Sequence, residues 1–253
     1  LSNIQLEQNT VNGYALGGGG WTTSRWSNVG NPYVVQSDIT IDDMATLTID
    51  PGVVIKFWRS RLYVSGVLLA EGSADAPIIF TSLADDEFGG DTDNNGDMAL
   101  PGPGNWNGVY FYDSSRDDKI ALSYIHVRYA NEPIVLSNAA PTLAGIQLEQ
   151  NTVNGYALGG GAWTTSRWSN VGNPYVVQND VSLDDMSTLT IDPGVVIKFW
   201  RSRLYVSGVL LAQGSAEQPL IFTSLADDTV GGDTDNNGDA ALPTPGDWNG
   251  LYF

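Results

Sequence analysis

The sequence predicts an all-β protein built from stacked coils, and three observations lead to that fold class. A long segment occurs twice at near identity. Short runs rich in β-branched and aromatic residues recur along the chain, each bounded by Gly, Pro, Asp or Asn. No stretch sustains the i, i+3, i+4 apolar spacing of an amphipathic helix.

The repeat sets the organisation of the chain. Residues 3–111 align without a gap to residues 145–253, an offset of 142, with 17 differences in 109 positions. Most exchanges are mild, such as Asp75 to Glu217, and the apolar runs stay apolar, as where Ile78 aligns with Leu220, so both copies build the same core. We therefore predict a first repeat over 1–144, whose register starts at residue 3. A second repeat covers 145–253 and lacks the counterpart of 112–142.

The apolar runs inside each repeat are three to six residues long, for example at 39–41, 53–57, 62–64, 67–70 and 77–80. No two-residue Asn-Gly or Asp-Gly hairpin loop joins neighbouring runs, because the Asn-Gly pairs lie in longer polar segments or directly after Trp. The runs favour rungs of about 20–25 residues that stack in parallel along an axis. The 142-residue repeat then contains about six coils.

One segment resembles a known group of proteins. It reads TLTIDPGVVIKFWRSRLYVSGVLLAEGSADAPIIFTSLADD over 46–86 and is followed by GGDTDNNGD and PGPGNWNGVYF. This succession is similar to the coils of bacterial secreted or cell-surface right-handed parallel β-helix repeat proteins with acidic Gly-Asp-Asn loops. The resemblance implies a right-handed parallel β-helix (β-solenoid) that is extended and extracellular.

Composition excludes several classes of partner. The net charge is −18 and the pI is about 4.1, which disfavours nucleic acid and anionic membranes. No apolar run approaches the ~18 residues of a membrane span, so we expect no membrane insertion. Cysteine is absent, so thiolate chemistry is excluded.

The residues with catalytic potential do not predict an enzyme. The single histidine, His126, has no Ser or Cys nucleophile motif beside it. Polysaccharide lyase or hydrolase chemistry remains an alternative, with three basic residues near Asp85 and Asp86. These are Lys56, Arg59 and Arg61, repeated as Lys198, Arg201 and Arg203. We favour the interpretation that Arg59 and Arg61 flank a turn and pair with some of the surplus acidic residues, because an enzyme rarely duplicates its site at near identity within one chain.

The stretch GGDTDNNGD, at 89–97 and again at 231–239, predicts a calcium site. From Asp91 onward, oxygen-bearing residues fall at positions 1, 3, 5 and 7, and glycine stands at position 6. This is the front half of an EF-hand-like loop. Position 12, which should be a bidentate Glu, is Gly102 in one copy and Thr244 in the other.

The missing ligand must therefore come from elsewhere, and the two aspartates just upstream are the best candidates. Asn105 and its counterpart Asp247 are further candidates. The predicted Ca²⁺ ligands of the first repeat are Asp85, Asp86, Asp91, Asp93, Asn95 and Asp97. Those of the second are Asp227, Asp228, Asp233, Asp235, Asn237 and Asp239. The alternative is a cluster of polar turns in which Asp side chains accept hydrogen bonds from backbone N–H groups.

The segment GGGGWTTSRWSNVGNPY, residues 17–33, contains a tryptophan pair. We expect Trp21 and Trp26 to pack onto the body rather than sit in a flexible linker. The alternative is that Trp and Tyr strips bind surface glycans by stacking.

Together these features predict a non-catalytic structural or adhesive protein, extracellular or on a cell surface. It would form an elongated, calcium-stabilised solenoid in a stalk, sheath or filament. Its expected partners are further copies of itself, joined end to end, and surface glycans. A carbohydrate-binding or polysaccharide-degrading β-helix is the alternative. We expect the 253 residues to belong to a longer tandem array, or copies to join into a filament.

Overall fold

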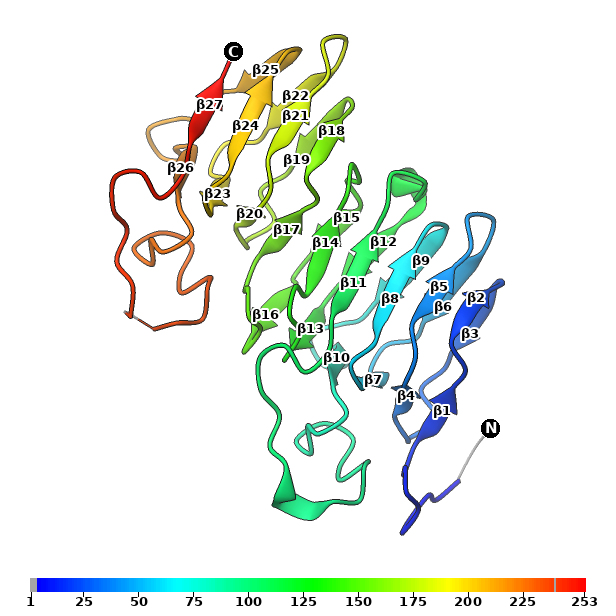
Figure 1. Ribbon diagram of the computed structural model, residues 1–253. Coiled ribbons are helices and arrows are strands. Elements are labelled where there is room, and N and C mark those ends of the chain that lie inside the picture. Colours follow the sequence, from blue (N-terminus) through cyan, green and yellow to red (C-terminus); the bar gives the residue numbers. More distant parts are fainter. Residues whose placement is uncertain (1–3, 239) are drawn as a thin grey trace.

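A computed structural model describes residues 4–238 and 240–253, and in this part the chain is a parallel β-solenoid (Figure 1). The described residues form 27 short strands, and each pairing between them is parallel and joins two strands that stand three apart in chain order. Three strands thus make one turn, and the strands form about nine turns. The all-β prediction is confirmed, since the described helices are two single-turn 3₁₀ segments, η1 (Gly96–Met98) and η2 (Asp117–Lys119).

Two sheets contain most of the strands. A six-stranded sheet contains β1 (Tyr14–Leu16), β4 (Tyr33–Val35), β7 (Val54–Phe57), β10 (Ile78–Ser82), β13 (Ile125–Arg128) and β16 (Gln147–Glu149). A nine-stranded sheet contains β2 (Gly19–Trp21), β5 (Ile39–Ile41), β8 (Arg61–Val64), β11 (Gly108–Phe111), β14 (Ile134–Leu136), β17 (Tyr156–Leu158), β20 (Tyr175–Val177), β23 (Val196–Phe199) and β26 (Ile221–Ser224).

Three shorter sheets complete the coil. The first contains β3 (Ser24–Trp26), β6 (Thr46–Ile49), β9 (Val67–Glu71), β12 (Ala121–Ser123) and β15 (Thr142–Ala144). The second contains β18 (Gly161–Trp163), β21 (Val181–Leu183), β24 (Arg203–Val206) and β27 (Gly250–Tyr252). The third contains β19 (Ser166–Trp168), β22 (Thr188–Ile191) and β25 (Val209–Ala212).

The core is a set of stacked apolar columns inside the coil. Alternate residues of each strand point inward, so Ile39 and Ile41 are buried while Thr40 between them is partly exposed. In-register pairing places Ile41, Val64 and Phe111 in successive rungs of one column. A short period-2 run in each coil is therefore enough to build a continuous core, as the sequence pattern indicates.

The repeat does not contain a whole number of turns. Tyr14 in β1 corresponds to Tyr156 in β17, sixteen strands later, which is five turns and one further strand. This is close to the predicted six coils. The extra strand matters because β17 pairs with β14, although β1 belongs to the six-stranded sheet. The strand that begins the second repeat, β17, therefore continues the nine-stranded sheet, whereas its counterpart β1 belongs to the six-stranded sheet.

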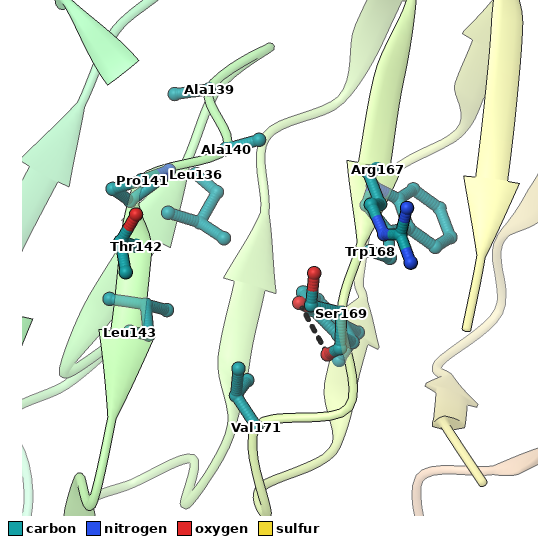
Figure 2. Close-up of a pocket in the computed structure, with 11 residues that line it drawn as sticks. Leu136, Ala139, Ala140, Pro141, Thr142, Leu143, Arg167, Trp168, Ser169 and Val171 are labelled. Carbon is teal, nitrogen blue, oxygen red and sulfur yellow. Dashed lines mark hydrogen bonds between the residues drawn. The ribbon is translucent and has the colours of Figure 1, made fainter. Parts of the chain in front are cut away.

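Beyond β16, one sheet consequently connects the two repeats. Among the described strands, β13 still pairs with β16 across the repeat boundary, but β15 and β16 end their sheets, β18 and β19 begin new ones, and the pairing of β14 with β17 continues the coil. A pocket of about 210 Å³ opens between β15 and β19 (Figure 2). Leu143 lies on one side and Trp168 on the other. We interpret this pocket as the gap left by the missing strand pairing.

Candidate functional site

The acidic loops are the largest departures from the regular coil. We define them as Asp85–Asp97, between β10 and β11, and Asp227–Asp239, between β26 and β27. Both stand away from the body of the solenoid (Figure 1). Asp239 and the side chain of Asp97, which the sequence predicted as ligands, lie outside the described part of the structure.

Although it protrudes, the first acidic loop also contacts earlier turns of the solenoid. Its fully buried Thr92 accepts a hydrogen bond through the backbone carbonyl from the Asn12 N–H at 2.7 Å. Asn12 precedes β1, three turns away from the loop's origin after β10. Gly89 packs over the ring of Pro32, just before β4, and over the Lys56 side chain in β7. The loop thus contacts the turns of β1, β4 and β7 as well as its own.

The second loop repeats this arrangement. The Asn154 N–H donates to the carbonyl of Thr234 at 2.6 Å, and Gly231 packs over Pro174. Lys198 of β23 donates to the carbonyl of Gly232 at 2.7 Å. Each acidic loop is therefore a clamp across four consecutive turns of its own repeat.

Three carboxylates converge within each clamp. Asp86, Asp91 and Asp93 each place an oxygen within 4.8 Å of the other two. Because Ca²⁺ takes oxygen ligands at about 2.3–2.6 Å, ligands on opposite sides of one ion lie roughly 5 Å apart, so this triad matches one ion. Asp228, Asp233 and Asp235 form the same triad in the second repeat.

Other atoms of the loop also suit a cation. Oδ1 of Asp93 and Oδ1 of Asn95 are inaccessible to solvent and have no hydrogen-bond donor among the described residues. A buried oxygen without a donor is costly, and a metal ion would satisfy it. In the second loop, burial raises the pKa of Asp235, while Oδ1 of Asn237 accepts from the Ala240 N–H at 3.1 Å. The two loops therefore offer similar but unequal ligand sets.

The turn geometry predicted as the alternative is also present. The Asp91 carboxylate accepts from the N–H groups of Asn95 and Gly96 at 3.1 and 3.0 Å. Asn94 and Gly96 have φ of 53° and 59°, the left-handed conformation that tight turns need. A carboxylate has about four lone-pair sites, so these two bonds leave capacity for a cation. The turns order the aspartates and do not compete with metal binding.

Of the two upstream aspartates, the structure places Asp86 in the triad and uses Asp85 otherwise. The buried Asp85 carboxylate accepts from Oγ1 of Thr81 and from the Glu87 N–H at 3.2 Å. In the second repeat, Asp227 accepts from Oγ1 of Thr223 and Oγ1 of Thr229, each at 2.6 Å. These residues fix the base of each loop.

Asn105 and Asp247, the other candidates for the closing ligand, also hold the loop base. Oδ1 of Asn105 accepts from the Gly102 N–H at 2.9 Å and from Oγ of Ser82 at 3.2 Å. The Asp247 carboxylate accepts from the Thr244 N–H at 2.8 Å and from Ser224 at 2.9 Å. Neither residue belongs to a triad.

Lys56 is a component of the clamp that sequence reasoning treated only as a catalytic alternative. Its side chain is fully buried, and Nζ donates to the carbonyls of Asp85 and Gly90 at 2.7 and 2.6 Å. Burial lowers the pKa of Lys56 to about 8, although the charges of Asp86 and Asp85 oppose this shift. In the sequence, a buried ammonium group is indicated by the single lysine within the apolar run VVIKF.

Arg128 ties the first clamp to the next two turns. The guanidinium lies in β13 and forms ion pairs with Asp85 at 3.6 Å, Glu87 at 2.7 Å and Glu149 of β16 at 3.1 Å. It also lies over the ring of Phe88, with Cζ 5.0 Å from the centroid. Arg128 belongs to the segment 112–142, and its proximity to the acidic loop is invisible in the sequence.

The structure does not gather the remaining basic candidates into one site. Arg59 lies over the ring of Trp58, and Arg61 contacts Asp38 at 3.8 Å and the ring of Tyr110. Their twins Arg201 and Arg203 make the same kinds of contact. His126 lies half-buried in β13, where burial lowers its pKa.

The packing of the tryptophan pair follows the prediction. Trp26 is buried and packs edge-on against Trp21, with ring centroids 5.7 Å apart, and it stacks on Tyr33. The Trp21 indole N–H donates to the carbonyl of Gly17 at 2.9 Å. The second repeat repeats these contacts with Trp163 and Trp168, both buried. Trp26, Trp163 and Trp168 belong to the core, and the partly buried Trp21 packs against it.

No function can be transferred to this chain from a known protein. No protein family, curated protein or solved structure matches the chain. No helix in the described residues is long and apolar enough to cross a membrane. By fold and organisation, the chain is a parallel β-solenoid of near-identical tandem repeats.

Proposed function

We propose that this chain is a non-catalytic structural or adhesive protein of the extracellular space or a cell surface, in which calcium locks the turns of the solenoid together. The observation that carries the proposal is the clamp itself. Each acidic loop contacts four consecutive turns and brings three carboxylates within reach of one cation. An ion in the triad would make the loop rigid and so hold the four turns together along the solenoid axis.

The charge balance supports a cation. Six acidic residues lie between Asp85 and Asp97, whereas the basic groups in contact are Lys56 and Arg128. The second loop contains five acidic residues, and Lys198 contacts it. The remaining like charges repel one another, and a divalent ion would relieve that repulsion. Millimolar calcium outside cells matches the roughly 10⁻⁴–10⁻³ M affinity of extracellular modules.

Calcium should raise the melting temperature. For a Kd of about 0.3 mM, 5 mM CaCl₂ contributes roughly 1.7 kcal/mol per site relative to EDTA. Differential scanning fluorimetry measures the shift, with NaCl at matched ionic strength because the net charge of −18 also responds to salt.

Two double variants make this test specific. Asp93→Asn with Asp235→Asn should abolish the calcium shift. Asp43→Asn with Asp185→Asn makes the same charge change at exposed residues outside the loops and should leave it intact. Equal melting temperatures of the unmodified chain in calcium and in EDTA would disprove the proposal.

The proposal includes end-to-end contact between copies. Sheet pairing already runs from one repeat into the next, so the surface of a turn is complementary to the turn that follows it in the chain. We expect molar mass, measured by light scattering, to rise with protein concentration, and electron microscopy to show rods longer than one chain. A constant monomer mass up to several milligrams per millilitre would contradict end-to-end association.

A further inference from the structure

A groove lies between the second acidic loop and the wall of the solenoid. Its volume is about 470 Å³, within the roughly 300–1,000 Å³ range of small-molecule sites. The corner residues Trp200 and Arg201 line it on the wall side. Asp235 of the second acidic loop lines the other side, together with Leu242 and Asp247 of the segment that follows the loop.

Trp200 gives the groove an exposed aromatic surface. Its side chain is 50% exposed, and its counterpart Trp58 in the first repeat is 52% exposed, whereas Trp163 and Trp168 are buried. Large aromatic residues are highly buried on average, and this corner exposes a tryptophan in both repeats. The glycan-stacking alternative from the sequence concerns Trp21 and Trp26, but Trp26 is buried and Trp21 packs against the core.

The backbone holds this corner in place. Arg201 has φ of 53°, an uncommon conformation for a residue with a side chain. Its N–H donates to the carbonyl of Asp247 at 2.8 Å, and its carbonyl accepts from Nδ2 of Asn249 at 2.7 Å. Arg59 repeats the conformation in the first repeat. Hydrogen bonds therefore hold the turn that carries Trp200, so the backbone needs little ordering when a ligand binds.

The polar groups of the groove include both donors and acceptors. The Arg201 guanidinium, whose Cζ lies 5.2 Å from the Trp200 ring centroid, is a donor. The carboxylates of Asp247 and Asp235 are acceptors, and Thr244 adds a hydroxyl group. A flat apolar face beside alternating donors and acceptors suits a pyranose, which has apolar C–H faces and a rim of hydroxyl groups. The net charge of −18 disfavours acidic sugars.

We propose that this groove binds a neutral oligosaccharide, with one sugar ring stacked on Trp200 and its hydroxyl groups hydrogen-bonded to Arg201 and Asp247. Asp235 belongs both to the groove and to the carboxylate triad, so calcium in the triad orders one wall of the groove. The calcium dependence rests on the proposed function; the stacking on Trp200 does not. The solenoid would then attach to glycan surfaces through its side.

The test is isothermal titration calorimetry with cellotetraose, chitotetraose, mannotetraose and maltotetraose in 5 mM CaCl₂. At least one should bind. Trp200→Ala should weaken binding at least tenfold, Trp200→Phe should retain most of it, and Asp247→Asn should weaken it severalfold. Met186→Ala removes another exposed apolar side chain, outside the groove, and should change nothing. The melting temperature of each variant checks that the fold is retained.

The outcomes separate this inference from the proposed function. The absence of binding for all four sugars, or equal affinity in Trp200→Ala and the unmodified chain, would overturn the saccharide groove. The calcium-induced melting shift, measured on the same samples, reports on the clamp alone. Weaker sugar binding in EDTA supports the link through Asp235, whereas equal binding with and without calcium would refute that link.

Discussion

Replacing Lys56 with methionine should destabilise the protein by about 2–4 kcal/mol in the absence of calcium. Methionine keeps the apolar length of the side chain but removes the ammonium group. The carbonyls of Asp85 and Gly90 then lose the donor that reaches them at 2.7 and 2.6 Å. The nearby carboxylates lose a positive charge at the same time, which leaves their repulsion less compensated. The measurement is thermal unfolding followed by far-UV circular dichroism in EDTA.

Calcium should recover part of this loss. A divalent ion in the triad of Asp86, Asp91 and Asp93 supplies the charge that Lys56→Met removes, so the variant should show a larger calcium-induced shift in melting temperature than the unmodified chain. The carbonyl groups stay unsatisfied, so recovery should be incomplete. An unchanged melting temperature in EDTA would show that the ammonium group does not hold the loop.

Lys198→Met is the matched variant in the second repeat. Lys198 is also fully buried, and burial lowers its pKa as well. Its Nζ donates to the carbonyl of Gly232 at 2.7 Å. We expect the same direction of effect, confined to the second repeat. Hydrogen exchange over 227–238 would locate it.

These variants depend on contacts that the sequence could not predict. The apolar runs at 39–41, 53–57 and 62–64 predict strands, and the structure has β5, β7 and β8 there. The alternation of apolar and polar residues over a few positions is a local signal for a strand, and each coil consists of such strands. The pairing of β17 with β14 is not local, because it depends on how many strands precede it in the repeat.

The candidate site also has a local part, which the sequence predicts, and a non-local part, which it does not. The spacing of Asp91 and Asp93 predicts a cation loop, and Asp86 just upstream joins them in the structure. That the loop turns back towards Asn12, 79 residues earlier, follows from the packing of whole turns and has no signature in the sequence. Lys56 stands out in the sequence as a lysine within an apolar run, but its role as a hydrogen-bond donor depends on the loop that covers it.

The largest single loss of stability should come from Trp106→Ala, at about 4 kcal/mol. Trp106 is fully buried where the loop returns to the wall, and it stacks on Phe57 with ring centroids 4.2 Å apart. Its indole N–H donates to the carbonyl of Arg128 at 2.7 Å. The substitution therefore leaves a large cavity and an unsatisfied buried carbonyl, and it detaches the base of the first clamp from both β7 and β13.

Trp248→Ala is the control that separates burial from residue type. Trp248 stacks on Phe199 at 4.5 Å in the same relative position, but it is partly exposed, so its removal should cost about 1–2 kcal/mol.

Urea denaturation followed by far-UV circular dichroism measures both variants without relying on tryptophan fluorescence. Because a solenoid can unfold one segment at a time, hydrogen exchange should accompany it. Trp106→Ala should expose β7, β11 and β13 together, since one ring joins the three turns to which those strands belong. Equal losses in the two variants would mean that the stacked pair, and not the burial of the loop base, sets the stability of the clamp.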